Sequence, residues 1–181
     1  MNLAQMKFRT VILDSGIEFQ APQGIQRIDT RSTHGWQVRY QGTKYFSDRS
    51  PNGESAKASL ERATDELLTR IAKYPAPVTI QSLPSSNKTT NLPSGISGPI
   101  LRRRSRSLKR IFEFSVVLPL YGKDPHRRTV YISGEESYTA EKYDAARAKA
   151  IELRRGAERQ YQDDATMARR GSALFLLNSS R

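Results

Sequence analysis

Side chains with forked hydrogen-bonding ends alternate with large apolar side chains in the segment "WQVRYQ". Successive side chains of a β-strand point to opposite faces, so the two kinds are sorted onto two faces. The apolar face holds Trp36, Val38 and Tyr40, and the polar face holds Gln37, Arg39 and Gln41. Arg matches the acceptors O6 and N7 of guanine in the DNA major groove, and Gln matches adenine. The segment predicts a base-reading surface, with the ordinary solvated face of a sheet as the alternative.

The strands expected on either side of this segment supply further candidates for base contact. These strands are shorter, and a register error of one residue exchanges their faces. The candidates are Gln26, Arg27 and Arg31 in the preceding strand and Lys44 and Tyr45 in the following one. We rank Arg39 and Gln37 first among all of them. Trp36 is expected to anchor its strand against a helix rather than to contact a base.

A basic cluster, "RRRSRSLKR", lies in the longest region of one charge sign. No acidic residue occurs between Glu66 and Glu113. Such a cluster predicts contacts with backbone phosphates, which add affinity without sequence information. The alternative is a solvated segment or a targeting signal. The candidate phosphate-binding residues in and after the cluster are Arg102, Arg103, Arg104, Arg106, Lys109 and Arg128.

The overall composition narrows the class of partner. The formal net charge of +12 and the pI near 10.2 favour a polyanion, with double-stranded DNA as the first expectation. The absence of cysteine excludes disulfides and thiolate metal sites. His34 and His126 lie far from any paired carboxylates, so we expect no catalytic residue, metal or cofactor. No apolar run approaches the roughly 20 residues that cross a bilayer. We therefore expect a cytoplasmic, nucleoid-associated protein that is not an enzyme.

Three short strands followed by an amphipathic helix are expected within residues 23–75. The helix is expected from Gly53 to about Tyr74, where the prolines of "YPAP" disfavour helical geometry. Its apolar stripe, spaced by three or four residues, is Ala56, Leu60, Ala63, Leu67 and Ile71. Residues 1–22 are expected to form an arm or an extra strand against this sheet.

The same order of elements returns in residues 98–162, after a linker at 76–97 that is rich in Ser, Thr and Pro. Its strands are expected in "GPILRRR", "FEFSVVLPLYG" and "RRTVYIS", with a longer, Pro-containing connection between the last two. A helix is expected from about Thr139 to Tyr161, and residues 163–181 are expected to form a tail. The segments "KYFS" and "VYIS" are taken as equivalent in the two halves.

Each half therefore contains three strands and one helix. This predicts an α+β fold of two small domains, each a three-stranded antiparallel sheet packed on one C-terminal α-helix. Such a sheet covers only one face with its helix, so the other face meets solvent or a partner. The apolar segment "ALFLLN" in the tail is expected to dock onto its own domain, with a homodimer or protein-partner contact as the alternative.

The order and spacing of several elements resemble the bacterial and phage branch of the Apetala/ethylene-response-factor DNA-binding domains. That family shares its fold with the arm-binding domains of phage integrases. The elements that carry the resemblance are Gly24, Ile25, Trp36, "KYFS", Gly53 and the Ala-rich helix. The second half looks like a diverged tandem copy, with Phe114 in place of Trp36 and Val117 in place of Arg39. The resemblance implies that a three-stranded sheet lies in the DNA major groove with its helix packed behind.

Together these patterns predict a sequence-specific double-stranded DNA-binding protein with tandem domains, acting as a transcription regulator. Two domains on neighbouring sites would gain avidity. An architectural or recombination-accessory DNA-binding protein is one alternative, and an RNA-binding protein is another. The second half replaces the polar triad with Ser115, Val117 and Pro119. The first half is therefore expected to read bases and the second mainly to grip phosphates.

Overall fold

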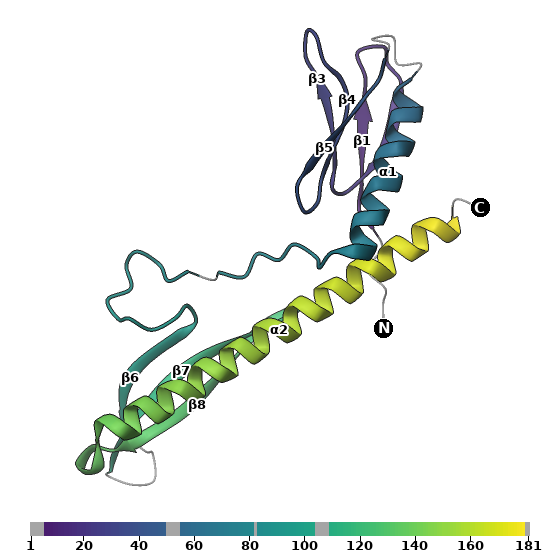
Figure 1. Cartoon of the computed structure of the whole chain (residues 1–181). Helices are drawn as coiled ribbons and strands as arrows, with labels where there is room; N and C mark the ends of the chain where they lie inside the picture. The colour runs from purple at the N-terminus through teal and green to yellow at the C-terminus, as the bar shows by residue number, and fades with distance from the viewer. Residues whose placement is uncertain (1–5, 50–54, 82, 104–108, 180–181) are drawn as a thin grey trace. The chain divides into compact units, whose positions relative to one another are not determined.

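The computed structural model describes residues 6–49, 55–81, 83–103 and 109–179 (Figure 1). The described residues form an α+β fold with three small antiparallel sheets and two α-helices. The chain divides into two compact units, and each has its own hydrophobic core. Unit 1 is Met1–Pro77 together with Ala165–Arg181, and unit 2 is Val78–Asp164. Over the described residues, neither helix carries an apolar stretch long enough to span a membrane.

Unit 1 is built from a hairpin, a three-stranded sheet and a helix (Figure 1). Its elements are β1 (Phe8–Ile12), β2 (Glu18–Pro22), β3 (Ile25–Asp29), β4 (His34–Arg39), β5 (Thr43–Ser47) and α1 (Ala56–Lys73). Strands β3, β4 and β5 pair antiparallel in that order. The apolar face of β4 and the apolar stripe of α1 pack together in one core, as their periodicities predict. The helix ends at Tyr74, which is extended at φ −109° and ψ 154° before Pro75.

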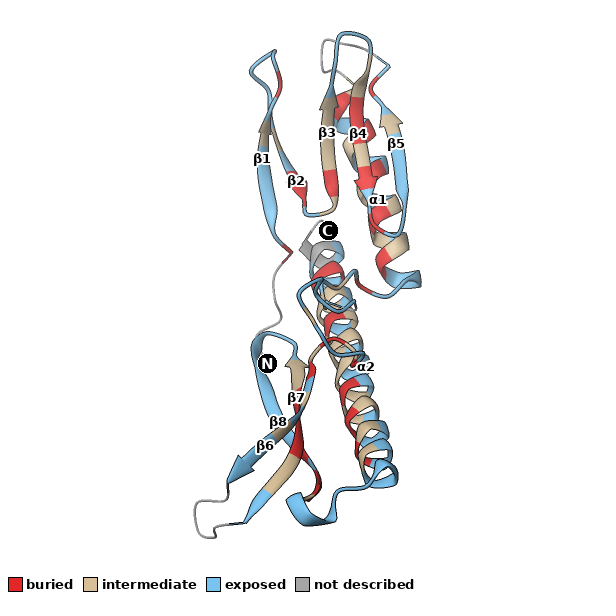
Figure 2. Cartoon of the chain, turned by 90° about the vertical axis from the view of Figure 1, so that its left-hand side faces the viewer, coloured by how far each residue is buried: buried red, intermediate tan, exposed pale blue. Residues whose placement is uncertain are grey.

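The N-terminal segment, expected to be an arm or an extra strand against the first sheet, forms a two-stranded sheet of its own that packs against the core of unit 1. In the β1–β2 register, Val11 lies opposite Phe19, and both pack against the core of unit 1. The ring of Phe19 meets Trp36 edge-on, with the ring centroids 5.8 Å apart. Because one face of the hairpin packs on the core, the other face, with Phe8 and Ile12, stays exposed (Figure 2).

Unit 2 contains a second three-stranded antiparallel sheet, in the order β6, β7, β8. The elements that follow the linker are β6 (Ile96–Arg103), β7 (Arg110–Leu120), β8 (Lys123–Gly134), a short 3-10 helix (Glu135–Ser137) and α2 (Ala140–Ser179). Ile96, Phe114, Val116 and Val130 of the sheet share a core with Ala150 of α2. Figure 2 shows this buried stripe along β7 and along the first part of α2.

The connection between β7 and β8 is a tight turn, so the expected longer, Pro-containing connection is wrong. Leu120 pairs with Lys123, which leaves Tyr121 and Gly122 as the turn. Gly122 has φ +68°, a backbone region that glycine adopts without steric cost. The register shifts between Leu118 and Leu120, and this irregularity accommodates Pro119, which has no N–H group to donate to the ladder.

Strand pairing relates residues of the two units in a different register from the one that the sequence suggests. Phe114 lies opposite Val130, as Trp36 lies opposite Phe46. Phe46 therefore corresponds to Val130, whereas matching "KYFS" with "VYIS" aligns Phe46 with Ile132. The proposed equivalence of these segments is wrong by two residues. In the longer β7–β8 hairpin, the segment "VYIS" lies two residues further along its strand than "KYFS" does in β5.

Helix α2 continues well beyond Tyr161, so the expected tail at 163–181 is helical through Ser179. No proline interrupts this stretch, and a single glycine, Gly171, is not enough to end a helix. Ala173 in the final turns lies in the core of unit 1, and Arg170 Nε donates to the Ile71 carbonyl oxygen at 3.3 Å. Ala173 of the segment "ALFLLN", which was expected to dock onto its own domain, therefore packs in unit 1, while Leu174 and Leu177 stay exposed.

Candidate nucleic-acid interface

The face of the β3–β5 sheet that points away from α1 carries a row of polar side chains. In the ladder, Gln26 lies opposite Gln37, and Gln37 lies opposite Tyr45. Arg39 lies opposite Thr43 one step further along the same face. We call this face, with Gln26, Gln37, Arg39, Thr43 and Tyr45, the outer face. Four of the five were candidates from the sequence, and Thr43 was missed although its alternation with Tyr45 was the available signal.

Arg39 is oriented by its neighbour on the same strand. Its Nε donates to Oε1 of Gln37 at 2.5 Å, and the side chain of Arg39 is exposed. Gln37 therefore fixes the direction of the guanidinium group. This arrangement leaves the two terminal nitrogens of Arg39 without a partner among the described residues. They form the fork that matches a guanine edge or a phosphate.

Tyr45 lies across Gly35, a residue that sequence reasoning did not select. A Cβ atom at Gly35 would stand 2.6 Å from Tyr45 Oη and 2.1 Å from the Phe46 carbonyl oxygen. Only glycine leaves room for this approach. The tyrosine ring is thereby held along the outer face, where it is 38% exposed and available to contact a base or a sugar. The available sequence signal was a glycine in one strand and an aromatic residue in the neighbouring strand.

Arg27 is not on the outer face, so its assignment to base contact is wrong. It lies opposite Trp36, and this register turns it towards the helix side. Its side chain is only 9% exposed and forms ion pairs with Asp48 and, at 2.7 Å, with Asp29. The guanidinium carbon lies 5.0 Å from the centroid of the Trp36 ring. Arg27 therefore holds the edge of the core together.

Lys44 is likewise on the helix side, because it lies opposite Val38 in the ladder. Its Nζ pairs with Glu66 of α1 at 2.6 Å. Hydrogen bonds from Lys44 and Arg70 hold the pKa of the Glu66 carboxyl below its usual value. Lys44 joins β5 to α1, so it does not lie on the outer face with the other predicted DNA-binding residues.

Gln41 and Arg31 lie in turns rather than in strands. Gln41 follows the end of β4 with φ +50°, and its Nε2 donates to the Pro75 carbonyl oxygen at 3.2 Å. The predicted triad on one face is therefore reduced to Gln37 and Arg39. Arg31, predicted to contact a base from the first strand, is instead exposed in the β3–β4 turn and lies off the outer face.

Two carboxylates of unit 1 give its stability a pH dependence. Partial burial opposes ionisation of Asp29, but hydrogen bonds from Arg27 and His34 outweigh it and hold the pKa of Asp29 below its usual value. The pKa of Glu66 is also lowered. A lowered folded-state pKa stabilises the fold above the unfolded-state pKa, which is near 4, and this stabilisation is lost as the pH falls through the folded-state pKa.

We therefore expect the melting temperature of unit 1 to be flat near neutral pH and to fall progressively below about pH 4. Circular dichroism melts between pH 6 and pH 2 measure this. In Asp29→Asn, the melting temperature at neutral pH should be lower and its fall in acid should be smaller. An unchanged acid dependence in this variant would contradict the role of Asp29.

The outer side of the β6–β8 sheet lacks the forked side chains of unit 1 on its central strand. Ile96 lies opposite Val116, as Ile25 lies opposite Val38, so Val117 occupies the place of Arg39. On the same side of β7, Glu113 forms an ion pair with Arg102 at 2.6 Å. Arg102 is therefore already paired on the sheet, which reduces its availability as a phosphate contact.

Positive charge gathers where β6 ends and β7 begins. Arg103 lies directly opposite Arg110 in the ladder, and Lys109 beside them is exposed. Like charges facing each other across strands are destabilising unless an anion lies between or above them. Arg110 has one carboxylate partner, Glu135, at 3.2 Å. The predicted phosphate-binding residues Arg104 and Arg106 lie outside the described residues.

Arg128, another predicted DNA-binding residue, lies on the helix side of its sheet, because it is opposite Val116. It is exposed at the edge strand. The neighbouring Arg127 lies opposite Val117 on the outer side and is exposed. Sequence reasoning missed Arg127, since choosing between adjacent arginines requires the register.

Replacement of Arg103 by alanine is expected to weaken binding to specific and random DNA by a similar factor. It should also reduce the slope of log affinity against log salt by about one, because one phosphate contact is lost. Fluorescence anisotropy titrations at several salt concentrations measure both quantities. Arg102→Ala is the matched comparison, and its effect should be smaller because Arg102 is paired with Glu113. A loss confined to the specific sequence would contradict the assignment of Arg103 to phosphates.

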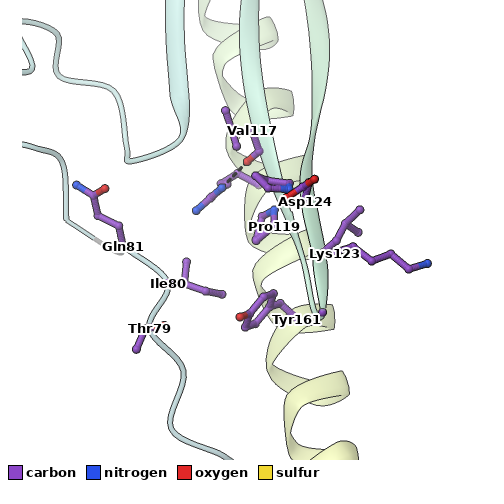
Figure 3. A pocket seen from close by; sticks show the side chains of 12 residues that line it. Thr79, Ile80, Gln81, Val117, Pro119, Lys123, Asp124 and Tyr161 are labelled. Carbon is purple, nitrogen blue, oxygen red and sulfur yellow. Dashed lines mark hydrogen bonds between the residues drawn. The ribbon is translucent and has the colours of Figure 1, made fainter. Parts of the chain in front are cut away.

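Unit 2 also contains an open pocket of about 710 Å³ between residues 79–81, the turn end of the β7–β8 hairpin, and α2 (Figure 3). Its buried cation is Arg154, which donates to the Val117 carbonyl oxygen and pairs with Glu158 at 2.6 Å. In unit 1, Arg70 likewise donates to the Tyr40 carbonyl oxygen at 3.0 Å. Arg154 thus joins the helix to the end of the central strand.

Comparison of the chain with protein-family models, with curated proteins and with solved structures gave no match.

Proposed function

We propose that the two units are two copies of one small DNA-binding domain, each a three-stranded sheet with a helix behind it. The chain binds double-stranded DNA sequence-specifically as a transcription regulator associated with the nucleoid. In this proposal the outer face of unit 1 enters the major groove. A thin sheet presents side chains broadside to base edges, as the β-ribbon DNA-binding proteins do.

The observation that carries the proposal is the row of Gln26, Gln37, Arg39 and Tyr45 on one face of the sheet. Among the described residues, the core of unit 1 takes no side chain from this face. A solvated face with no role does not need a guanidinium group oriented by a glutamine or a glycine that makes room for a tyrosine. Three of the four side chains are Arg or Gln, which form bidentate pairs with guanine or adenine.

Unit 2 has a different part in the proposal. Its central strand offers Ser115 and Val117 where unit 1 offers Gln37 and Arg39. Among its described residues, exposed cations that form no ion pair include Arg103, Lys109 and, along β8, Arg127. Unit 2 therefore grips phosphates and adds affinity, while unit 1 supplies sequence preference. The linker between them allows both units to engage neighbouring sites.

Competition binding tests this function. The preferred sequence is first selected from a pool of random duplexes, and it then competes against random DNA and structured RNA at two salt concentrations. A regulator keeps a preference of about 10³-fold or more for the selected sequence at the higher salt concentration. A binder that loses this preference is an architectural or recombination-accessory protein. A binder that prefers the RNA belongs to the RNA-binding alternative.

A further inference from the structure

A groove with an apolar floor runs along α1 on the side of unit 1 away from the outer face. It has a volume of about 580 Å³ and lies between α1, residues of both faces of the β1–β2 hairpin and Leu177 of α2. Its apolar lining is Phe8, Phe19, Pro22, Leu60, Leu68 and Leu177. Phe8 and Leu177 are 46% and 48% exposed, and Ile12, further along the same hairpin face, is 62% exposed. A groove with exposed apolar side chains of this kind marks an interaction site.

The rim of the groove is acidic, which sets it apart in a chain of net charge +12. Glu18, Glu61 and Asp65 line it, against one cation, Lys57. None of these three carboxylates forms an ion pair with another residue that the structure describes. Elsewhere in the described part of unit 1, Asp29, Asp48 and Glu66 are paired with Arg or Lys, and Asp14 in the β1–β2 turn is not. Three of the four carboxylates without an ion pair there thus line the groove.

The length of the groove indicates the shape of its occupant. The lining residues of α1 run from Lys57 to Leu68, about three helical turns or roughly 16 Å. A helix of similar length that lies along α1 would place apolar side chains at every third or fourth position on the floor. Its remaining side chains would then face the rim, where Lys or Arg finds a carboxylate.

We propose that this groove binds a basic amphipathic helix of a protein partner. The partner inserts an apolar stripe between α1 and the β1–β2 hairpin, and its Lys or Arg side chains pair with Glu18, Glu61 and Asp65. Because α1 covers the face of the sheet opposite to the outer face, both surfaces of unit 1 are accessible at once. The site thus gives unit 1 a protein contact that is independent of its nucleic-acid contact.

The probe is a synthetic peptide of about 18 residues in which leucines recur every three or four positions and lysines fill the rest. A peptide of the same composition in scrambled order is its control. Isothermal titration and amide chemical shifts measure binding to the full chain. We expect the helical peptide to bind at least tenfold more tightly than the scrambled one and to shift amides of α1 and of the β1–β2 hairpin.

A charge-reversal pair tests the rim. Glu61→Lys combined with Asp65→Lys is expected to weaken peptide binding about tenfold or more, because like charges then face the peptide. Glu136→Lys combined with Glu152→Lys makes the same change in net charge on exposed residues of unit 2 and should leave peptide binding unchanged. Both pairs should keep the DNA sequence preference, so this test fails or succeeds separately from the DNA proposal.

Three outcomes overturn the proposal. Equal binding of the scrambled peptide shows only nonspecific attraction. Equal weakening by both charge-reversal pairs shows an effect of net charge. A chain that self-associates in sedimentation, and becomes monomeric only in Glu61→Lys with Asp65→Lys, has a second copy of itself in the groove.

Discussion

Replacement of Trp36 by alanine is expected to cost about 3–5 kcal/mol of stability, because it removes a large buried aromatic side chain. Trp36 is 0% exposed at the centre of the unit 1 core. Its Nε1 donates to the Ala56 carbonyl oxygen at 2.8 Å, which joins β4 to the first turn of α1. Phe19 of the hairpin and Arg27 of β3 contact the same ring. One side chain therefore links four elements of the unit.

A loss of this size is a large part of the 5–15 kcal/mol that typically stabilises a domain, so unit 1 should be largely unfolded or close to it. Amide hydrogen exchange resolved by residue measures the effect separately in β3–β5 and in β6–β8. Trp36→Phe is the control, since it keeps an aromatic ring and loses only the indole hydrogen bond and part of the volume. It should cost clearly less than Trp36→Ala. Protection lost equally in both sheets, or equal costs for the two variants, would contradict this account.

The core of unit 1 could be predicted from the sequence because the strand period and the helix period each define one apolar face. Trp36, Val38 and Tyr40 alternate with polar residues over a full strand, and the stripe of α1 repeats every three or four residues. Each pattern is long enough to define a face without knowledge of the partner. The fold class and the place of Gln37 and Arg39 followed from the same alternation.

The faces on which Arg27 and Lys44 lie could not be predicted in this way. Their strands have only five residues each, and polar residues occur on both faces, so the alternation is weak. The face is decided by pairing, which puts Arg27 opposite Trp36 and Lys44 opposite Val38. Their partners Asp48 and Glu66 lie about 20 residues further along the chain, and no local pattern connects them.

Unit 2 shows a second limit, which comes from prolines and helix ends. Pro119 and Pro125 are typical of a loop, but a bulge places both in long paired strands beside the Tyr121–Gly122 turn. Helix α2 continues through Ser179 because tertiary packing of Ala173 in unit 1 supports its last turns. Neither the bulge nor the packing leaves a signal in the nearby sequence.

Replacement of Arg39 by alanine is expected to relax the preference for one base pair by about 1–3 kcal/mol, or roughly ten- to a hundredfold in relative affinity. Arg39 is the arginine of the outer face, and its terminal nitrogens have no partner among the described residues. Loss of the guanidinium group removes a bidentate contact with a base edge. Affinity for random DNA should fall much less, because only one charge is lost.

Lys44→Ala is the matched control, because it removes one positive charge from the adjacent strand on the opposite face. Its ammonium group pairs with Glu66, so the variant should lose some stability and keep its base preference. Affinities for every single-base variant of the selected site, measured for both proteins, give the comparison. Arg39→Ala should flatten the profile at one position, and Lys44→Ala should leave all positions unchanged. If Arg39→Ala instead lowers the affinity for every sequence by the same factor, then Arg39 binds a phosphate and the bases are read elsewhere.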